Sequence, residues 1–160
     1  MSDEIKVGIS DYKIGESPDK LITLGLGSCV GIAIYNKSSK VGGLSHIMLP
    51  DSTFFMKDLK PEKFADLAIP KMVSEITKGR SYANLVAKIA GGASMFNFAD
   101  KKTNTNIGER NVLAVQQKLK ELGIPILASD TGGSIGRTMI VDLESFVVKI
   151  RTANREITIL

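Results

Sequence analysis

Residues 21–50 read LITLGLGSCVGIAIYNKSSKVGGLSHIMLP, which predicts two antiparallel strands joined by a short turn. Val30, Ile32 and Ile34 alternate with other residues, which is typical of a strand, and NKSS (36–39) has the composition of a turn. The stretch also contains the only cysteine of the chain, Cys29, and the only histidine, His46. Two residue types that often carry out chemistry therefore fall within one predicted hairpin.

The length of the turn decides how these two residues face each other. If residues 36–39 form a four-residue loop, Tyr35 lies opposite Lys40 and Cys29 lies opposite His46. Directly opposed residues project to one face with Cβ atoms about 4.5–5.5 Å apart, which lets a thiol meet an imidazole. A slip of one residue would put them on opposite faces.

A cysteine and a histidine in contact are the minimum for a thiol nucleophile. The histidine accepts the proton, and the resulting ion pair lowers the pKa of the thiol. Thr23 is a candidate for the third group, which orients the imidazole through its hydroxyl or its carbonyl. Gly27 and Ser28 precede Cys29, and backbone N–H groups there are candidates for supporting an oxyanion. A small buried cysteine and a structural histidine are the alternative interpretation.

The rest of the chain mixes strand and helix patterns. Asp11 to Lys20 is rich in turn residues, and apolar runs predict strands at 5–9, 83–90, 124–128, 137–143, 146–151 and 156–160. Helical spacing predicts two helices, one beginning near Glu62 and one ending at Gly123. Pro70 predicts a kink in the first helix or a new start there. We expect one α+β domain, residues 1–160, with layered antiparallel or mixed sheets in a sandwich-like arrangement and two main helices packed outside.

Composition excludes several classes of function. The net charge of +4 is not clustered and aromatic residues make up 6%, so we expect no nucleic-acid binding. No apolar run reaches the length of a membrane span, and the acidic start does not resemble a signal peptide. A lone thiol fits the reducing cytoplasm. One cysteine and one histidine are too few for a zinc site, and the strand pattern after Gly25-Leu26-Gly27 argues against a dinucleotide loop.

Further candidates lie outside the hairpin. Asn106, Arg110 and Asn111 lie at the start of the second helix, where Asn106 caps the helix or the group contacts substrate. Gly91-Gly92 forms a tight turn or lets a partner helix approach. Several loop or helix residues could contact substrate or partner, with burial as the alternative for the apolar ones: Phe54, Phe55, Met56, Met95, Phe96 and Arg110.

The sequence resembles the CheD chemoreceptor glutamine deamidases. The resemblance depends on TLGLGSCVGIAIYN (23–36), GGLSHIMLP (42–50), AKIAGGASMF (87–96), NIGERNV (106–112) and DTGG (130–133), which occur in the order and spacing of that family. It implies that the protein converts specific glutamines of bacterial chemoreceptors (methyl-accepting chemotaxis proteins) to glutamate during chemotaxis adaptation. By this resemblance Cys29 is the nucleophile, His46 the base and Thr23 the third member, and no metal or organic cofactor is needed.

The resemblance also implies a fold similar to toxin deamidases and papain-type thiol hydrolases. The implied partners are the cytoplasmic helices of chemoreceptors and a CheC-type response-regulator phosphatase. We therefore expect a cytoplasmic enzyme that is recruited to membrane-bound receptors. The alternative is a binding module that docks on receptors and on the phosphatase, with catalysis secondary. A general cysteine protease is disfavoured because 160 residues leave little chain for an extended cleft.

Overall fold

The computed structural model describes residues 3–53, 59–94 and 106–160. In these ranges the chain forms ten strands, two α-helices and one short 3₁₀ helix. Their order is β1 (Glu4–Val7), β2 (Asp11–Glu16), β3 (Lys20–Leu26), β4 (Val30–Asn36), β5 (Val41–Ile47), η1 (Pro61–Lys63), α1 (Ala65–Thr77), β6 (Leu85–Gly91), α2 (Ile107–Glu121), β7 (Ile126–Thr131), β8 (Arg137–Asp142), β9 (Val148–Thr152) and β10 (Ile157–Ile159).

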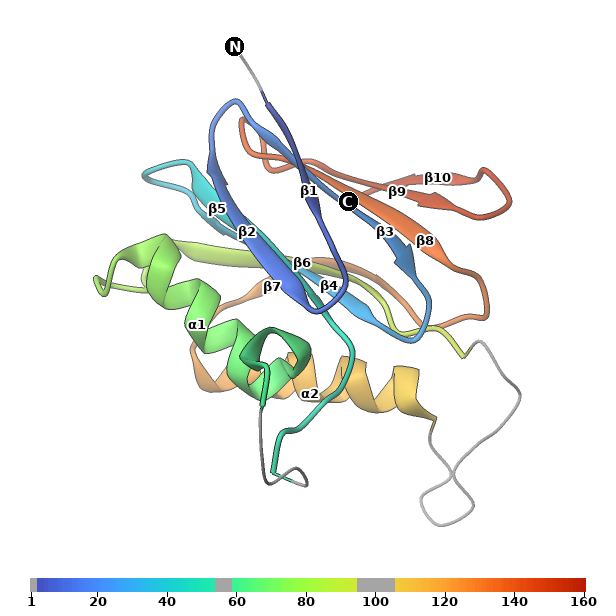
Figure 1. Cartoon of the computed structure of the whole chain (residues 1–160). Coiled ribbons are helices and arrows are strands. Elements are labelled where there is room, and N and C mark those ends of the chain that lie inside the picture. The colour runs from blue at the N-terminus through green and yellow to red at the C-terminus, as the bar shows by residue number, and fades with distance from the viewer. Residues whose placement is uncertain (1–2, 54–58, 95–105) are drawn as a thin grey trace.

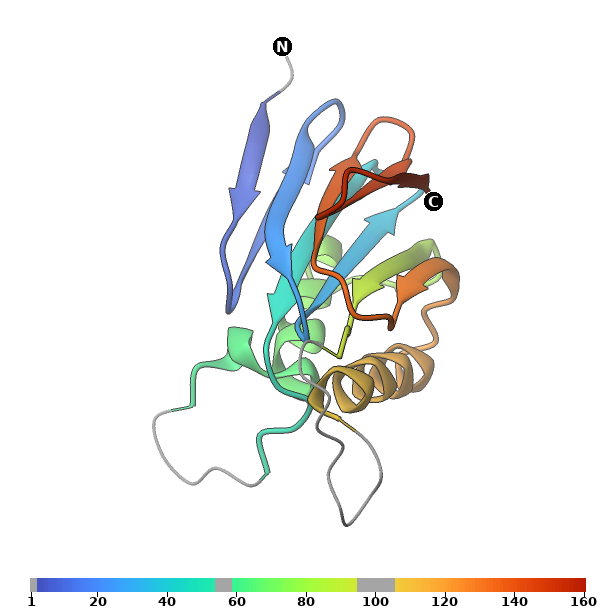
Figure 2. The same cartoon turned by 90° about the vertical axis from the view of Figure 1, so that its right-hand side faces the viewer.

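The strands form two five-stranded sheets. The outer sheet has the order β1-β3-β8-β9-β10, and the central sheet has the order β2-β5-β4-β6-β7. The pairs β1–β3 and β6–β7 are parallel and the other pairs are antiparallel. Figures 1 and 2 show α1 and α2 on one face of the central sheet and the outer sheet on its other face. The predicted α+β arrangement of mixed sheets with helices outside is therefore confirmed.

Strand β4 lies between both cores, and its side chains divide between them. Val30, Ile32 and Ile34 pack in the cluster that α1 and α2 complete. Cys29, Ala33 and Tyr35 belong to the second cluster, which fills the space between the two sheets. Because side chains alternate along a strand, this division places Cys29 on the face toward the outer sheet.

The turn predicted for residues 11–20 is largely wrong. Strand β2 occupies Asp11–Glu16 and pairs antiparallel with β5 at the edge of the central sheet. Tyr12 is buried there and Ile14 packs against the core on the helix side. Lys13, between them, is exposed, so its charge concealed a strand with one apolar face.

The helices follow the predicted spacing. Asn106 is the N-cap of α2, and its side chain accepts a hydrogen bond of 2.8 Å from the Glu109 backbone N–H. This confirms the capping interpretation of Asn106. Pro70 lies inside α1 and not in its first turn. Within the described ranges no helix is long and apolar enough to cross a membrane.

Candidate active site

A hydrogen bond between the two sheets joins Thr23 to His46. Thr23 lies on β3 of the outer sheet and His46 on β5 of the central sheet, and each side chain is 1% exposed. Thr23 Oγ1 lies 2.7 Å from His46 Nδ1 and 2.8 Å from the carbonyl oxygen of Val7. The bond to a carbonyl requires the hydroxyl proton, so Thr23 donates to Val7 and accepts from the Nδ1–H of His46. The side-chain hydroxyl of Thr23 therefore orients the ring.

This arrangement fixes the tautomer of His46. With the proton on Nδ1, Nε2 carries the lone pair, and Nε2 is buried without a hydrogen-bond partner among the described residues. Burial lowers the pKa of His46 from 6.5 to about 4, so the ring is neutral at neutral pH. A buried basic nitrogen with a fixed lone pair is the arrangement that a general base needs.

Cys29 immediately precedes β4 and is 8% exposed. Burial raises the pKa of its thiol, and the backbone N–H of Cys29 itself acts in the opposite direction. Both groups of the predicted pair are thus held in their neutral forms. The thiolate–imidazolium ion pair expected from the sequence is disfavoured without substrate, and proton transfer would accompany attack.

The predicted hairpin register is wrong by two residues. Gly31, not Cys29, lies opposite His46, and Tyr35 lies opposite Gly42. The loop is longer because Asn36 accepts hydrogen bonds from the backbone of Ser38 and Ser39 through its side chain, and from the Lys40 N–H through its carbonyl.

A shift of two residues keeps the face unchanged, since side chains repeat every second position. Cys29 therefore still projects to the face of His46, as its diagonal neighbour. In a regular ladder such neighbours have Cα atoms about 7–8 Å apart. Gly31 lies directly opposite His46, and a Cβ added there would lie 2.7 Å from Met139 Sδ, so the Met139 side chain would have to shift.

The glycine-rich turn before Cys29 has a defined geometry. Gly25 has a φ of 70°, in the left-handed region, at the irregularity where the pairing of β3 with β8 shifts. The N–H of Gly27 donates to Gly25 O at 3.0 Å, and the carbonyl of Gly27 accepts from Ala93 N at 2.9 Å. Gly27 is therefore used in shaping the turn, and its N–H is already engaged.

Gly91 and Gly92 lie directly against Cys29. The N–H of Gly92 donates to the carbonyl of Cys29 at 2.8 Å, and Gly91 pairs with Val30. A Cβ on Gly91 would lie 2.3 Å from that carbonyl oxygen, and the φ of Gly91 is 107°. These two glycines permit a close backbone approach that holds the segment carrying Cys29.

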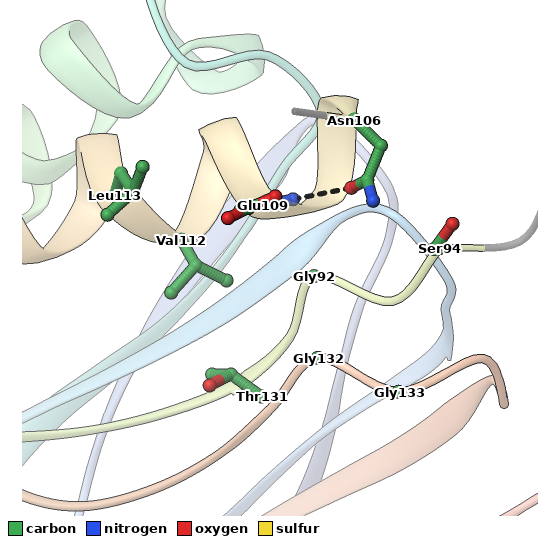
Figure 3. Close-up of a pocket in the computed structure, with 9 residues that line it drawn as sticks. All are labelled: Gly92, Ser94, Asn106, Glu109, Val112, Leu113, Thr131, Gly132 and Gly133. Carbon is green, nitrogen blue, oxygen red and sulfur yellow. Dashed lines mark hydrogen bonds between the residues drawn. The ribbon is translucent and has the colours of Figure 1, made fainter. Parts of the chain in front are cut away.

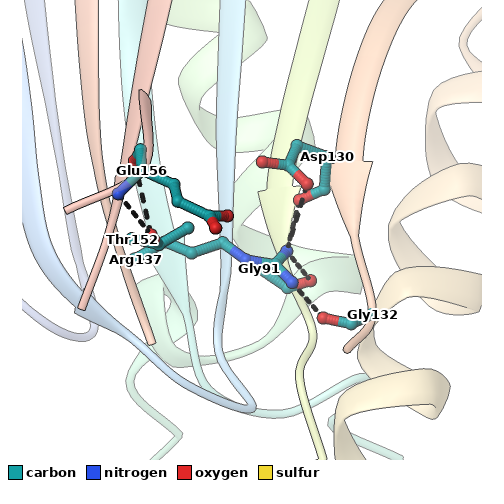
Figure 4. A network of polar contacts seen from close by, with 6 residues as sticks. All are labelled: Gly91, Asp130, Gly132, Arg137, Thr152 and Glu156. Atoms are coloured by element: carbon teal, nitrogen blue, oxygen red, sulfur yellow. Dashed lines mark hydrogen bonds and ion pairs between the residues drawn. The ribbon is translucent and has the colours of Figure 1, made fainter. Parts of the chain in front are cut away.

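Arg137 holds the adjoining ends of β6 and β7 (Figure 4). Its buried guanidinium donates hydrogen bonds to the carbonyl oxygens of Gly91, Asp130 and Gly132. Arg137 belongs to β8 of the outer sheet, so it is a second polar link between the sheets. The sequence did not indicate this role, because a lone arginine at the start of a strand gives no signal of its targets.

Asn111 is a second residue whose role was missed. It is fully buried on α2, and its Nδ2 donates to Ser28 O and to Met48 O, both at 2.9 Å. A signal was available in the sequence: Asn111 lies four and eight residues before Val115 and Leu119, on the apolar face of the helix.

A cavity of about 300 Å³ opens beside this segment (Figure 3). Residues 131–133, Gly92 and the first turns of α2 line it, the last through Glu109, Val112 and Leu113. Gly92 both lines the cavity and donates to the carbonyl of Cys29, so the cavity lies beside the segment that carries Cys29.

The structure describes only some of the remaining residues that were predicted to contact substrate or partner. Arg110 is exposed on α2, next to Asn111. Five predicted contact residues lie outside the described residues: Phe54, Phe55, Met56, Met95 and Phe96. Among the described residues, no group of three or more His, Cys, Asp or Glu side chains could hold a metal ion.

A family model and sequence relatives identify the same family. Residues 48–152 match the family described as CheD chemotactic sensory transduction. A Clostridium botulinum (strain Hall) protein named probable chemoreceptor glutamine deamidase CheD is 59% identical over 150 residues, 93% of each chain. A protein of the same name from Clostridium acetobutylicum is 56% identical over 93% of this chain and 90% of its own length.

Among solved structures, the Bacillus licheniformis hypothetical protein YfiH matches with a TM-score of 0.48 and 15% identity, over 78% of this chain and 51% of its own. The sequence relatives span nearly the whole chain and include the segments around Cys29 and His46. The chain belongs to the CheD family.

Proposed function

We propose that this protein is a chemoreceptor glutamine deamidase that acts in chemotaxis signalling. It hydrolyses the side-chain amide of specific glutamines on methyl-accepting chemotaxis proteins to glutamate, as a protein-glutamine amidohydrolase. The names of its relatives indicate the substrate. The observation that carries the chemistry is the hydrogen bond between Thr23 Oγ1 and His46 Nδ1, because it presents Nε2 as a proton acceptor on the face of Cys29.

Acylation begins when the glutamine side chain reaches Cys29. The thiol proton moves to His46 Nε2 as Sγ attacks the amide carbon, which forms a C–S bond and an oxyanion. The imidazolium then returns its proton to the amide nitrogen, the C–N bond breaks, and ammonia leaves. Thr23 stays bonded to Nδ1 throughout and stabilises the transient positive charge of the ring.

Deacylation uses the same base. His46 takes a proton from water, the hydroxide attacks the thioester carbonyl, and the C–S bond breaks to give glutamate and the Cys29 thiol. Backbone N–H groups beside Cys29 stabilise both oxyanions. One such donor is often worth about 3–4 kcal/mol of transition-state stabilisation. Ser28 and Gly27 support this segment, Gly27 through the turn that it shapes.

The resemblance to toxin deamidases and papain-type thiol hydrolases belongs to the same proposal. Support comes from the set of roles, a cysteine nucleophile, a histidine base and a third polar group on the imidazole; here these are Cys29 just before β4, His46 on β5 and Thr23 at Nδ1. By this proposal the enzyme uses neither a metal nor an organic cofactor. Because its substrate is the cytoplasmic helices of receptors, we propose that the enzyme acts in the cytoplasm, at membrane-bound receptors.

The test is direct. Purified receptor cytoplasmic fragments are incubated with the wild-type protein and with Cys29→Ala, and peptide mass spectrometry maps conversions of glutamine to glutamate. We expect conversion at discrete sites with the wild type and none with Cys29→Ala, while both proteins unfold at similar temperatures. Full activity of a folded Cys29→Ala protein would refute the mechanism, and peptide cleavage in place of deamidation would indicate a protease.

We propose a CheC-type phosphatase as a second partner, with a share of its contacts near the active-site cavity. Leu113 supports this placement, because it lines that cavity while 54% of its surface remains exposed. Binding of the phosphatase to Cys29→Ala is measured with and without Leu113→Ser. Loss of binding with Leu113→Ser supports the placement, and unchanged binding rejects it. Regulation that survives in Cys29→Ala would favour the alternative of a binding module with catalysis secondary.

A further inference from the structure

Asn111 is the one described side chain bonded to the segments of both Cys29 and His46. Its two amide protons go to two carbonyl oxygens, that of Ser28, just before Cys29, and that of Met48, two residues after His46. The reverse orientation of the amide would place its oxygen against two acceptors, so the network assigns the nitrogen to this side. Both donor positions of the side chain are used.

The position is unfavourable for an asparagine on packing grounds alone. Asn111 is 0% exposed, and its Oδ1 is buried without a hydrogen-bond partner among the described residues. An unpaired buried acceptor costs about 1–3 kcal/mol. Val115 and Leu119, on the same face of α2, are ordinary core residues. The asparagine thus occupies a buried position on an apolar helix face, where its two bonds to carbonyl oxygens offset the unpaired Oδ1.

The two bonded carbonyls lie just beyond the end of a strand pair. Val30 and Ile47 form the last paired position of β4 and β5, so the ladder does not fix the backbone at Ser28 and Met48. Asn111 adds a constraint from the helix layer, beside the bonds from the Gly92 N–H to Cys29 O and from the Met48 N–H to Lys63 O. Its side chain bridges the two segments at the end of the hairpin where Cys29 and His46 lie.

The bond to Ser28 also sets the direction of one N–H group. The carbonyl of Ser28 and the N–H of Cys29 belong to one peptide plane, and in a trans peptide they point in opposite directions. Because Asn111 holds the carbonyl toward α2, the Cys29 N–H points away from α2, toward the side of the thiol. The effect of that N–H on the pKa of the Cys29 thiol agrees with this direction.

We propose that Asn111 is a positioning residue that aims the Cys29 N–H at the developing oxyanion and holds the end of β5 beside it. The inference depends on the proposed role of Cys29 as nucleophile. Attack by Sγ forms the oxyanion on the carbon bonded to sulfur, within reach of the N–H of the same residue. A donor fixed before the reaction costs no reorganisation in the transition state.

Asn111→Leu tests the proposal, because leucine matches the volume and removes both donors. We expect kcat for receptor deamidation to fall by at least about tenfold, toward the 100- to 1,000-fold loss seen when an oxyanion donor is removed, with little change in KM. Alkylation of Cys29 by iodoacetamide forms no oxyanion. Its limiting rate at high pH, where the thiol is ionised in both proteins, should therefore stay within about twofold of the wild type, whereas a re-aimed N–H raises the pKa of the thiol.

Val115→Ala is the matched control on the same helix face. It opens a cavity and lowers the melting temperature without touching Ser28 or Met48, and its kcat should remain that of the wild type. If Asn111→Leu does not fold, Asn111→Ser replaces it, and the same loss of kcat is expected. A kcat loss below about tenfold, or an equal loss of kcat and of alkylation rate, overturns the inference.

A measurement on the wild type gives a spectroscopic readout. A receptor peptide with glutamic semialdehyde in place of the target glutamine forms a hemithioacetal with Cys29, in which the C–S bond forms and the thiol proton ends on oxygen. The amide proton of Cys29 should shift downfield on binding, and an unshifted signal counts against the proposal. A wild-type protein that does not deamidate receptors overturns the proposed function, whereas an active Asn111→Leu enzyme overturns the Asn111 inference alone.

Discussion

Acidification should destabilise this protein through one histidine. His46 is 1% exposed, and burial lowers its pKa from 6.5 to about 4 in the folded protein. In the unfolded chain the ring takes up a proton as the pH falls below about 6.5, while in the folded protein it resists until about pH 4. The stability contributed by the neutral ring is thus complete above pH 6.5 and is lost progressively down to about pH 4. The difference corresponds to about 3 kcal/mol.

Two measurements test this magnitude. Because His46 is the only histidine, its Cε1–H signal can be followed by proton NMR through an acid titration without assignment. Urea unfolding of the wild type and of His46→Asn is then compared between about pH 7 and pH 4. Asparagine keeps an N–H donor near Thr23 but cannot be protonated. The difference in unfolding free energy between the two proteins should change by about 3 kcal/mol over this range, since contributions from carboxylates cancel.

The reasoning is refuted by a titration midpoint near the ordinary histidine pKa in the folded protein. A difference in unfolding free energy that does not vary with pH would contradict it equally. The same titration bears on catalysis, because a ring that stays neutral to about pH 4 leaves the base available throughout the neutral range. Loss of activity at mildly acidic pH should therefore follow unfolding, not titration of the folded enzyme.

Three substitutions extend these tests. Thr23→Val leaves the His46 N–H and the Val7 carbonyl unpaired, so it should lower the free energy of unfolding by roughly 2–4 kcal/mol and also lower kcat. Thr23→Ser should keep most of the wild-type stability and most of the wild-type kcat. Equal effects of the two variants would contradict the hydrogen-bond assignment. Gly91→Ala should destabilise the protein more than Gly79→Ala. Both glycines have a positive φ, but the new Cβ at 91 would lie 2.3 Å from the Cys29 carbonyl oxygen, whereas the Cβ at 79 would meet open space. Urea unfolding of the two variants gives the comparison. Arg137→Met removes the guanidinium from three carbonyls, of which Gly91 O keeps its bond from the Gly132 N–H. The carbonyls of Asp130 and Gly132 lose this donor, so we expect a loss of roughly 2–4 kcal/mol and slower deamidation. A melting temperature like that of the wild type would show that other groups hold the β6 and β7 ends.

The strands could be predicted where apolar residues alternate, and the exception has a physical reason. Strand β4 is buried on both faces and alternates between two cores, so its sequence indicates it strongly. Strand β2 is an edge strand with one apolar face, and its outward residues resemble those of a loop. The register of the hairpin was missed because the side chain of Asn36 and the left-handed Lys40, with a φ of 58°, lengthen the loop by local bonding.

From the sequence we could predict only the part of the candidate site that lies on neighbouring strands. Parity placed Cys29 and His46 on one face even with the wrong register, because a shift of two residues preserves the face. Thr23 was a candidate from the sequence alone, but its hydrogen bond to His46 depends on how two sheets pack, which no local pattern specifies. To predict the role of Asn111, one would have to know which carbonyl oxygens α2 covers in the folded protein.

The hydrogen bond between sheets has a consequence for the order in which the protein becomes active during synthesis. Strand β3 has β8 as its antiparallel partner, and β8 is translated after every strand of the central sheet. A nascent chain can thus form the hairpin that carries Cys29 and His46 before the sheet that carries Thr23 is complete. We therefore expect the hydrogen bond between Thr23 and His46, and with it the proposed activity, to form only after β8 has been synthesised.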